Sequence, residues 1–144
     1  MESEIFEILD QYPNLNYFGF GLINNGKGLT ESEQKLKLKK LQDELFANIA
    51  QIEHVVNWLH NVDEIRSFNQ NRSSYGLKHL AEKTAPNSYV ANGSFIVGAI
   101  LANFRVKIDR PNAYFNMSEK SLKLKVEEIE RLKKTKQVIS HVMR

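Results

Sequence analysis

Residues 94–104, SFIVGAILANF, restrict the folding of this chain more than any other segment. In a helix over 93–104, apolar side chains would lie on every side, so no face is left for water. Such a helix is stable only when other elements enclose it, and Gly98 allows one neighbour to approach closely. The run is about half the length of a membrane span, so it predicts a buried helix and no transmembrane segment.

Two long amphipathic helices are expected around it. The first, over 31–60, begins at the capping-box pattern of Thr30 and Glu33, and the second, over 119–142, follows Ser118. The first helix carries a seam with heptad spacing, interrupted at Asn48, which suits packing in a bundle or pairing with a second copy. The residues of this seam are Leu38, Leu41, Leu45, Ile52, Val55 and Leu59.

A β-hairpin is predicted over 105–117, because RVKID alternates polar and apolar residues, RPN is typical of a turn, and AYFNM can return. The resulting fold class is mainly α (α+β). We expect a single-domain helical bundle around the buried helix 93–104, with this one small hairpin and the long helices 31–60 and 119–142.

Shorter elements are expected between these. They are a helix over 3–12, a brief strand within 17–23, a helix at EIRSFNQNR (64–72), and a helix from Ser73 or Ser74 to about Thr84. In the last of these, Tyr75 is expected to face inward, and Lys78 and His79 to face water. Asn92 is expected to cap the helix 93–104.

Composition limits the cellular compartments and the kinds of chemistry that we expect for this chain. The chain has no cysteine, which excludes disulfides, thiolate nucleophiles and sulfur-ligated zinc and fits a reducing compartment. Its start, MESEIFEILDQY, lacks the basic flank and the long apolar run of a signal peptide. We therefore expect a cytoplasmic protein with no membrane partner.

Charge is unevenly distributed along the chain. Residues 1–104 hold 9 Lys and Arg against 12 Asp and Glu, a balance of −3, whereas residues 105–144 hold 11 against 5, a balance of +6. This asymmetry fits an anionic partner, usually nucleic acid. A solvated, lysine-rich last helix explains the same asymmetry, and by itself the asymmetry favours this simpler explanation.

Patterns typical of catalysis or metal binding are few. His54 and His60 would lie on different faces of one helix and so do not share a metal, and His79 with Glu82 offers two ligands without a third. NNGKGLT lacks the spacing of a phosphate-binding loop, and no nucleophile lies in an elbow beside a base. We expect no cofactor and no metal, and an enzyme with a site around His79 is the third hypothesis.

The leading hypothesis is a non-enzymatic nucleic-acid-binding protein. A helix, a turn, a buried helix and a basic hairpin, in this order, resemble a winged helix-turn-helix. The helix 93–104 offers only Ser94 and Asn103 as polar groups, so backbone contact is expected in place of base reading. The candidate contact residues are Arg72, Lys78, His79, Arg105, Lys107 and Arg110 for phosphates, and Asn112, Tyr114 and Tyr89 for hydrogen bonds or stacking.

Two other interpretations stay open. The aromatic residues of this block, including Tyr75, Tyr89 and Tyr114, would also suit a purely structural core. Alternatively, the chain is a protein-binding adaptor or inhibitor, for example of a host defence or regulatory complex. Its contact surface would then be the helix 31–60, which could also form a homodimer seam, or the basic helix 119–144.

Three blocks, SSYGLKHLAE, YVANGSFIVGAI and RPNAYFNMS, all within residues 72–118, resemble small uncharacterised proteins of bacterial plasmids and phages. The resemblance covers roughly a third of the chain. It implies a setting and no specific activity: an accessory role in a mobile element, such as DNA handling, regulation or interference with a host system.

Overall fold

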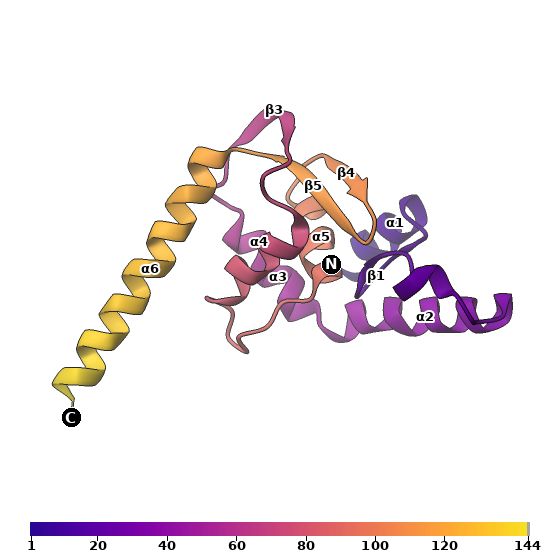
Figure 1. Ribbon diagram of the computed structural model, residues 1–144, viewed down its shortest axis with the longest axis horizontal. Coiled ribbons are helices and arrows are strands. Elements are labelled where there is room, and N and C mark those ends of the chain that lie inside the picture. The colour runs from indigo at the N-terminus through magenta and orange to yellow at the C-terminus, as the bar shows by residue number, and fades with distance from the viewer. Residues whose placement is uncertain (144) are drawn as a thin grey trace.

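The computed structural model describes residues 1–143, which are mainly helical with two small antiparallel sheets (Figure 1). The helices are α1 (Glu2–Gln11), α2 (Glu31–Ala47), α3 (Ile49–Trp58), α4 (Ser74–Glu82), α5 (Asn92–Leu101) and α6 (Glu119–Val142). The strands are β1 (Leu15–Asn16), β2 (Gly19–Phe20), β3 (Glu64–Asn69), β4 (Val106–Asp109) and β5 (Asn112–Met117). Among the described residues, no helix has both the length and the apolar character needed to cross a membrane.

The predicted hairpin and last helix are confirmed. Strands β4 and β5 pair antiparallel from Val106 opposite Phe115 to Asp109 opposite Asn112. The last helix spans the predicted residues, and the hydroxyl of Ser118 accepts a hydrogen bond from the backbone N–H of Ser121 at its start. Both elements follow from local signals, namely a turn sequence and a cap.

The prediction of one continuous helix over 31–60 is wrong, because the chain bends at Asn48 between α2 and α3. The side-chain amide of Asn48 donates a hydrogen bond to the carbonyl of Glu44 at 2.9 Å, and such side-chain bonds compete with helix continuation. The bend places α3 against α5. Four residues of the heptad seam are buried against other parts of the same chain: Leu45, Ile52, Val55 and Leu59. They are therefore not available to pair with a second copy.

The expected helix at EIRSFNQNR is also wrong, since most of this segment forms strand β3. It pairs with β5 and gives the sheet order β3-β5-β4. The side chain of Asn116 supports the pairing by donating to the carbonyl of Ile65 at 3.2 Å. The strand before α4 and the hairpin after α5 therefore belong to one sheet. The connection from α4 to α5, residues 83–91, is much longer than a helix-turn-helix turn.

Helix α5 is enclosed at its start. Residues 92–99 are all buried, and the helix contacts α1, α3, α4, β2 and β5. It ends at Leu101, earlier than predicted, and its N-cap is Ala91 in place of Asn92. The amide of Asn92 is used elsewhere: it donates to the carbonyl of Phe18 at 3.1 Å and to Oδ1 of Asn112 at 3.0 Å.

The β1–β2 turn, where a brief strand was expected, is seated directly on the start of α5. The N–H of Gly93 donates to the carbonyl of Tyr17 at 3.0 Å. A Cβ at position 93 would lie 2.8 Å from the carbonyl carbons of Asn16 and Tyr17, which is closer than real contacts allow. Only glycine fits here, because the two backbones touch.

Candidate nucleic-acid interface

The hairpin presents three exposed cations. Arg105, Lys107 and Arg110 are exposed, and within residues 1–143 none of them forms a salt bridge. Lys107 pairs with Tyr114 in the ladder, so both lie on the outer face of the sheet, opposite to the buried Phe115. This surface combines positive charge with a partly exposed aromatic ring.

Arg105 is partly tied to its own sheet. Its guanidinium lies 5.2 Å from the ring centre of Phe68 and donates to the backbone carbonyl of Arg66. Its backbone N–H donates to Oδ1 of Asn116 at 2.7 Å. These contacts orient the guanidinium without cancelling its charge, so it remains available to an anion.

Arg72, in contrast, is neutralised inside the molecule. Its guanidinium makes a two-pronged contact with Glu119, with Nη2 at 2.8 Å from Oε2 and Nε at 3.1 Å from Oε1. The amide of Asn69 donates to the same carboxylate at 3.0 Å. The hydrogen bond from Arg72 outweighs burial and lowers the pKa of Glu119. The pair ties the first turn of α6 to the segment before α4.

The expected orientation of α4 is wrong for two residues. Lys78, expected to face water, is only 5% exposed, whereas Tyr75, expected inside, is 54% exposed. The buried residues Ser74, Leu77, Lys78 and Ala81 follow the i, i+3, i+4, i+7 spacing of one helix face. The long apolar stem of lysine allows it to occupy this face.

Lys78 and His79 share one carboxylate. Nζ of Lys78 lies 3.1 Å from Oε1 of Glu82, and Nδ1 of His79 lies 2.9 Å from Oε2. Burial raises the pKa of Glu82, but hydrogen bonds from His79, Lys78 and the N–H of Val90 outweigh it, so the pKa is lowered. Nζ of Lys78 also lies 4.7 Å from the ring centre of Tyr89. This cluster joins α4 to the α4–α5 connection.

An open pocket of about 780 Å³, which we name the aromatic cleft, lies beside this cluster. Its walls come from the β1–β2 turn, α2, α4, the α4–α5 connection, the start of α5 and the tip of the hairpin. Among residues 1–143, no Asp or Glu lines it. The lining residues are Tyr17, Phe18, Ile23, Lys37, Leu41, Tyr75, Lys78, His79, Tyr89, Asn92, Pro111 and Asn112.

The sequence-predicted contact residues fall into two groups. Lys78, His79, Tyr89 and Asn112 meet at the aromatic cleft, and Arg110 lines a neighbouring pocket between residues 21–25 and the first half of α2. A second group does not reach the cleft: Arg72, Arg105, Lys107 and Tyr114. The other eight lining residues were not predicted as candidates: Tyr17, Phe18, Ile23, Lys37, Leu41, Tyr75, Asn92 and Pro111. A signal for Tyr17 and Phe18 was present, because the aromatic run NYFGF is unusual in a glycine-rich loop.

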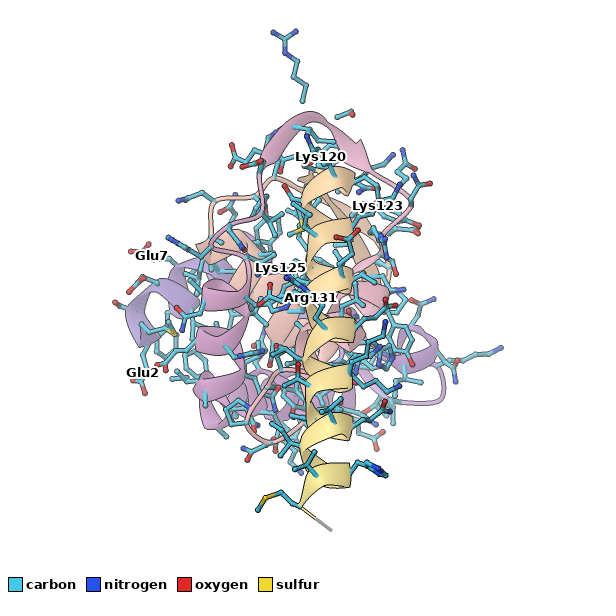
Figure 2. The ribbon with its side chains drawn as sticks, turned by 90° about the vertical axis from the view of Figure 1, so that its left-hand side faces the viewer. Glu2, Glu7, Lys120, Lys123, Lys125 and Arg131 are labelled. Carbon is cyan, nitrogen blue, oxygen red and sulfur yellow. The ribbon has the colours of Figure 1, made fainter. Side chains whose placement is uncertain are left out.

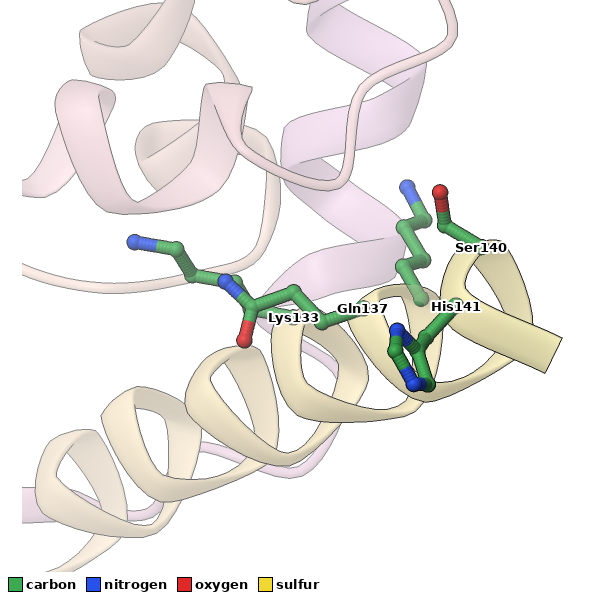
Figure 3. A pocket seen from close by; sticks show the side chains of 5 residues that line it. Lys133, Gln137, Ser140 and His141 are labelled. Carbon is green, nitrogen blue, oxygen red and sulfur yellow. The ribbon is translucent and has the colours of Figure 1, made fainter. Parts of the chain in front are cut away.

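The second half of α6 forms a separate surface. Residues 130–143 are exposed, and the helix projects away from the other elements (Figure 1). Seen from that side, α6 lies in front of the rest of the molecule (Figure 2). A shallow pocket of about 430 Å³ follows one flank of this helix, lined by Lys133, Lys136, Gln137, Ser140 and His141 (Figure 3). In the part of the chain that the structure describes, no three His, Cys, Asp or Glu side chains lie close enough to hold a metal ion.

Comparison with protein-family models, with curated proteins and with solved structures found no match. A function for this chain is therefore inferred from its own geometry.

Proposed function

We propose that this protein is a small, non-enzymatic nucleic-acid-binding protein, and that its contact surface is formed by the hairpin and the adjoining aromatic cleft. The observation that carries the proposal is the combination of unpaired hairpin cations with a neighbouring cleft free of carboxylates, within the described residues 1–143. Cations of this kind bind phosphates by displacing counterions, and exposed aromatic rings stack on bases. The setting implied by the resemblance, a plasmid or phage accessory protein, agrees with this role.

In this proposal α5 is the central buried helix of the fold and does not enter a groove. Residues 92–99 are buried, so they offer no side chains to base edges. Contact through the hairpin and the cleft would depend on backbone charge and on stacking. We therefore expect binding with little sequence preference.

The test is binding of fluorescent single- and double-stranded DNA and RNA over a salt series from about 50 to 200 mM, in which phosphate-mediated affinity falls steeply. Replacing Arg105 and Lys107 together by alanine should weaken binding of all sequences alike. It should also flatten the salt dependence, because the logarithmic slope falls by roughly one unit for each phosphate that is no longer neutralised.

A matched control removes two cations elsewhere. Lys133→Ala with Lys134→Ala changes the net charge by the same amount, far from the hairpin on the projecting part of α6 (Figure 1). Equal weakening by both double variants would mean that binding follows net charge and not the hairpin. Absence of binding to every nucleic acid at the lowest salt would contradict the proposal.

A second candidate function, protein binding as an adaptor or inhibitor, is favoured by the projecting part of α6. After Glu130 it carries Arg131, Lys133, Lys134 and Lys136 with no acidic residue among residues 131–143, beside the exposed apolar side chains of Leu132, Val138, Ile139 and Val142. A basic helix with an apolar stripe suits an acidic, apolar groove in a partner.

Two pairs of substitutions distinguish the two candidate functions. Leu132→Ser with Ile139→Ser should abolish capture of a protein partner from a host-cell extract and leave nucleic-acid binding unchanged. Arg105→Ala with Lys107→Ala should do the reverse. A partner retained by the α6 variant would remove this helix from the second hypothesis.

A further inference from the structure

We propose that the aromatic cleft holds one unpaired nucleobase, so that the preferred ligand is single-stranded nucleic acid. The inference rests on the proposed function and specifies its substrate class. It follows from the aromatic walls of the cleft, from its charge, from its free hydrogen-bonding groups and from the burial of α5.

The walls of the cleft leave aromatic surface open to a ligand. Tyr75 and Tyr89 are 54% and 47% exposed, although both border a concave surface where burial would be favourable. Both rings are also positioned by neighbours. The ring of Tyr75 packs edge-on against His79 at 4.6 Å between centroids, and Lys78 lies against one face of Tyr89. The ring faces that stay open are therefore already ordered. A base that stacks on them binds more tightly, because little side-chain mobility is lost on binding.

The charge of the cleft selects the kind of aromatic ligand. Among residues 1–143, no carboxylate lines the cleft, and its lining cations are Lys37 and Lys78. Lys78 pairs with Glu82 behind the wall, whereas Lys37 forms no salt bridge within residues 1–143. A cationic ligand is disfavoured, because Lys78 already occupies the position between the rings that an ammonium group would take. A ligand that combines an aromatic ring with negative charge fits both features, and a nucleotide unit of a polynucleotide has this combination.

Two polar side chains are left with free groups at the cleft. Oδ1 of Asn112 accepts from the amide of Asn92 at 3.0 Å, which fixes the Asn112 side chain and leaves its NH2 group with no partner among the described residues. Nδ1 of His79 is engaged by Glu82, so Nε2 is its second hydrogen-bonding atom. These groups can meet the polar edge of a base, which a stacked and paired base does not expose in this way.

The fold disfavours a duplex as the ligand of this site. In a winged helix-turn-helix arrangement, α5 would occupy the position of the groove-reading helix, but the β1–β2 turn covers its start and residues 92–99 are buried. A base inside a duplex is stacked on both sides and cannot enter a pocket without being flipped out. A single strand presents such bases without that cost, and Arg110, which lines the neighbouring pocket, can contact its backbone.

The experiment compares a fluorescent ten-nucleotide single strand with a blunt duplex of the same sequence, as DNA and as RNA, by anisotropy at low salt. Tyr75→Ala with Tyr89→Ala should weaken single-strand binding by roughly tenfold or more, as expected when base stacking is removed. Duplex binding should change less than about twofold, since phosphate contacts dominate it. Tyr75→Phe with Tyr89→Phe is the matched control: it keeps the rings and should bind like the unaltered protein.

Three outcomes separate the two proposals. Undiminished single-strand binding by the alanine variant overturns this inference while leaving the proposed function intact, and so does binding to duplex alone. If the unaltered protein binds none of the nucleic acids tested, the proposed function itself is overturned. Because both tyrosines are about half exposed, the alanine variant should fold, and thermal unfolding with circular dichroism verifies this before binding is compared.

Discussion

The contact between the β1–β2 turn and the start of α5 can be tested by adding a single methyl group. Gly93→Ala would place a Cβ 2.8 Å from the carbonyl carbons of Asn16 and Tyr17, and closer still to the carbonyl oxygen of Asn16. These are backbone atoms, so no side chain can rotate away. The β1–β2 turn must therefore move away from α5, and the hydrogen bond from the N–H of residue 93 to the carbonyl of Tyr17 must lengthen.

The magnitude follows from three contributions. Overpacking of a tight contact costs about 1–3 kcal/mol, and we take the upper end because the obstacle is backbone. Loss of a net hydrogen bond costs about 1 kcal/mol. The better helix propensity of alanine returns up to about 1 kcal/mol. We therefore expect the free energy of unfolding to fall by about 3 kcal/mol, and the melting temperature of a domain of this size by roughly 6–12 °C.

The control is Gly76→Ala in α4. A Cβ at position 76 would meet only the hydroxyl oxygen of Ser73, at the ordinary contact distance of 3.7 Å. The same substitution there should be neutral or stabilising by up to about 1 kcal/mol. Urea unfolding of both variants, followed by circular dichroism, measures the difference. A Gly93→Ala protein as stable as Gly76→Ala would refute the placement of the turn on α5, and with it one wall of the aromatic cleft.

Three further predictions concern stability. Glu119→Gln should lower the free energy of unfolding at pH 7 and make it less dependent on pH in acid. The pKa of Glu119 is lowered in the folded protein, so the unaltered protein loses the stabilisation from this carboxylate as pH falls through that pKa; urea midpoints at pH 7 and pH 3 measure the difference. Ser74→Ala should cost about 1–3 kcal/mol, because the N–H of Ala113 would lose its 3.0 Å hydrogen bond to Oγ in a buried position, whereas Ser74→Thr would retain an acceptor; thermal unfolding compares the two. Lys125→Met should leave the melting temperature unchanged or raise it, because burial against Trp58 lowers the pKa of this lysine and a charged form is disfavoured there; a clear loss of stability would contradict this reasoning.

Elements with local signals were predictable from the sequence. The hairpin within 105–117 and the helix 119–142 were predicted correctly, because turn residues and a capping serine act on their immediate neighbours. Strand β3 was missed for the opposite reason. Its partner β5 lies far along the chain, with Asn69 opposite Phe115, and the segment EIRSFN has little strand character of its own.

The aromatic cleft could not be predicted from sequence, because it combines segments that only the fold brings together: residues 17–18, 37–41, 75–79, 89–92 and 111–112. The inward position of Lys78, however, could have been found. Positions 74, 77, 78 and 81 share one helix face, and the lysine was assigned to water from its charge alone.

The salt bridges formed by the predicted contact residues show why a count of charges along the sequence does not describe the charge of a surface. Of the cations predicted to contact phosphates, Arg72 forms a salt bridge with Glu119 and Lys78 with Glu82, and both pairs hold helices in place. Within residues 1–143, the hairpin cations Arg105, Lys107 and Arg110 stay exposed and unpaired, on the element that can approach a ligand from outside. The positive charge that could attract an anion is thus smaller than the sequence suggests but more localised, at the hairpin beside the aromatic cleft. The ligand proposed above needs a surface of this form, because a single nucleic-acid strand offers phosphate and an exposed aromatic ring at one place.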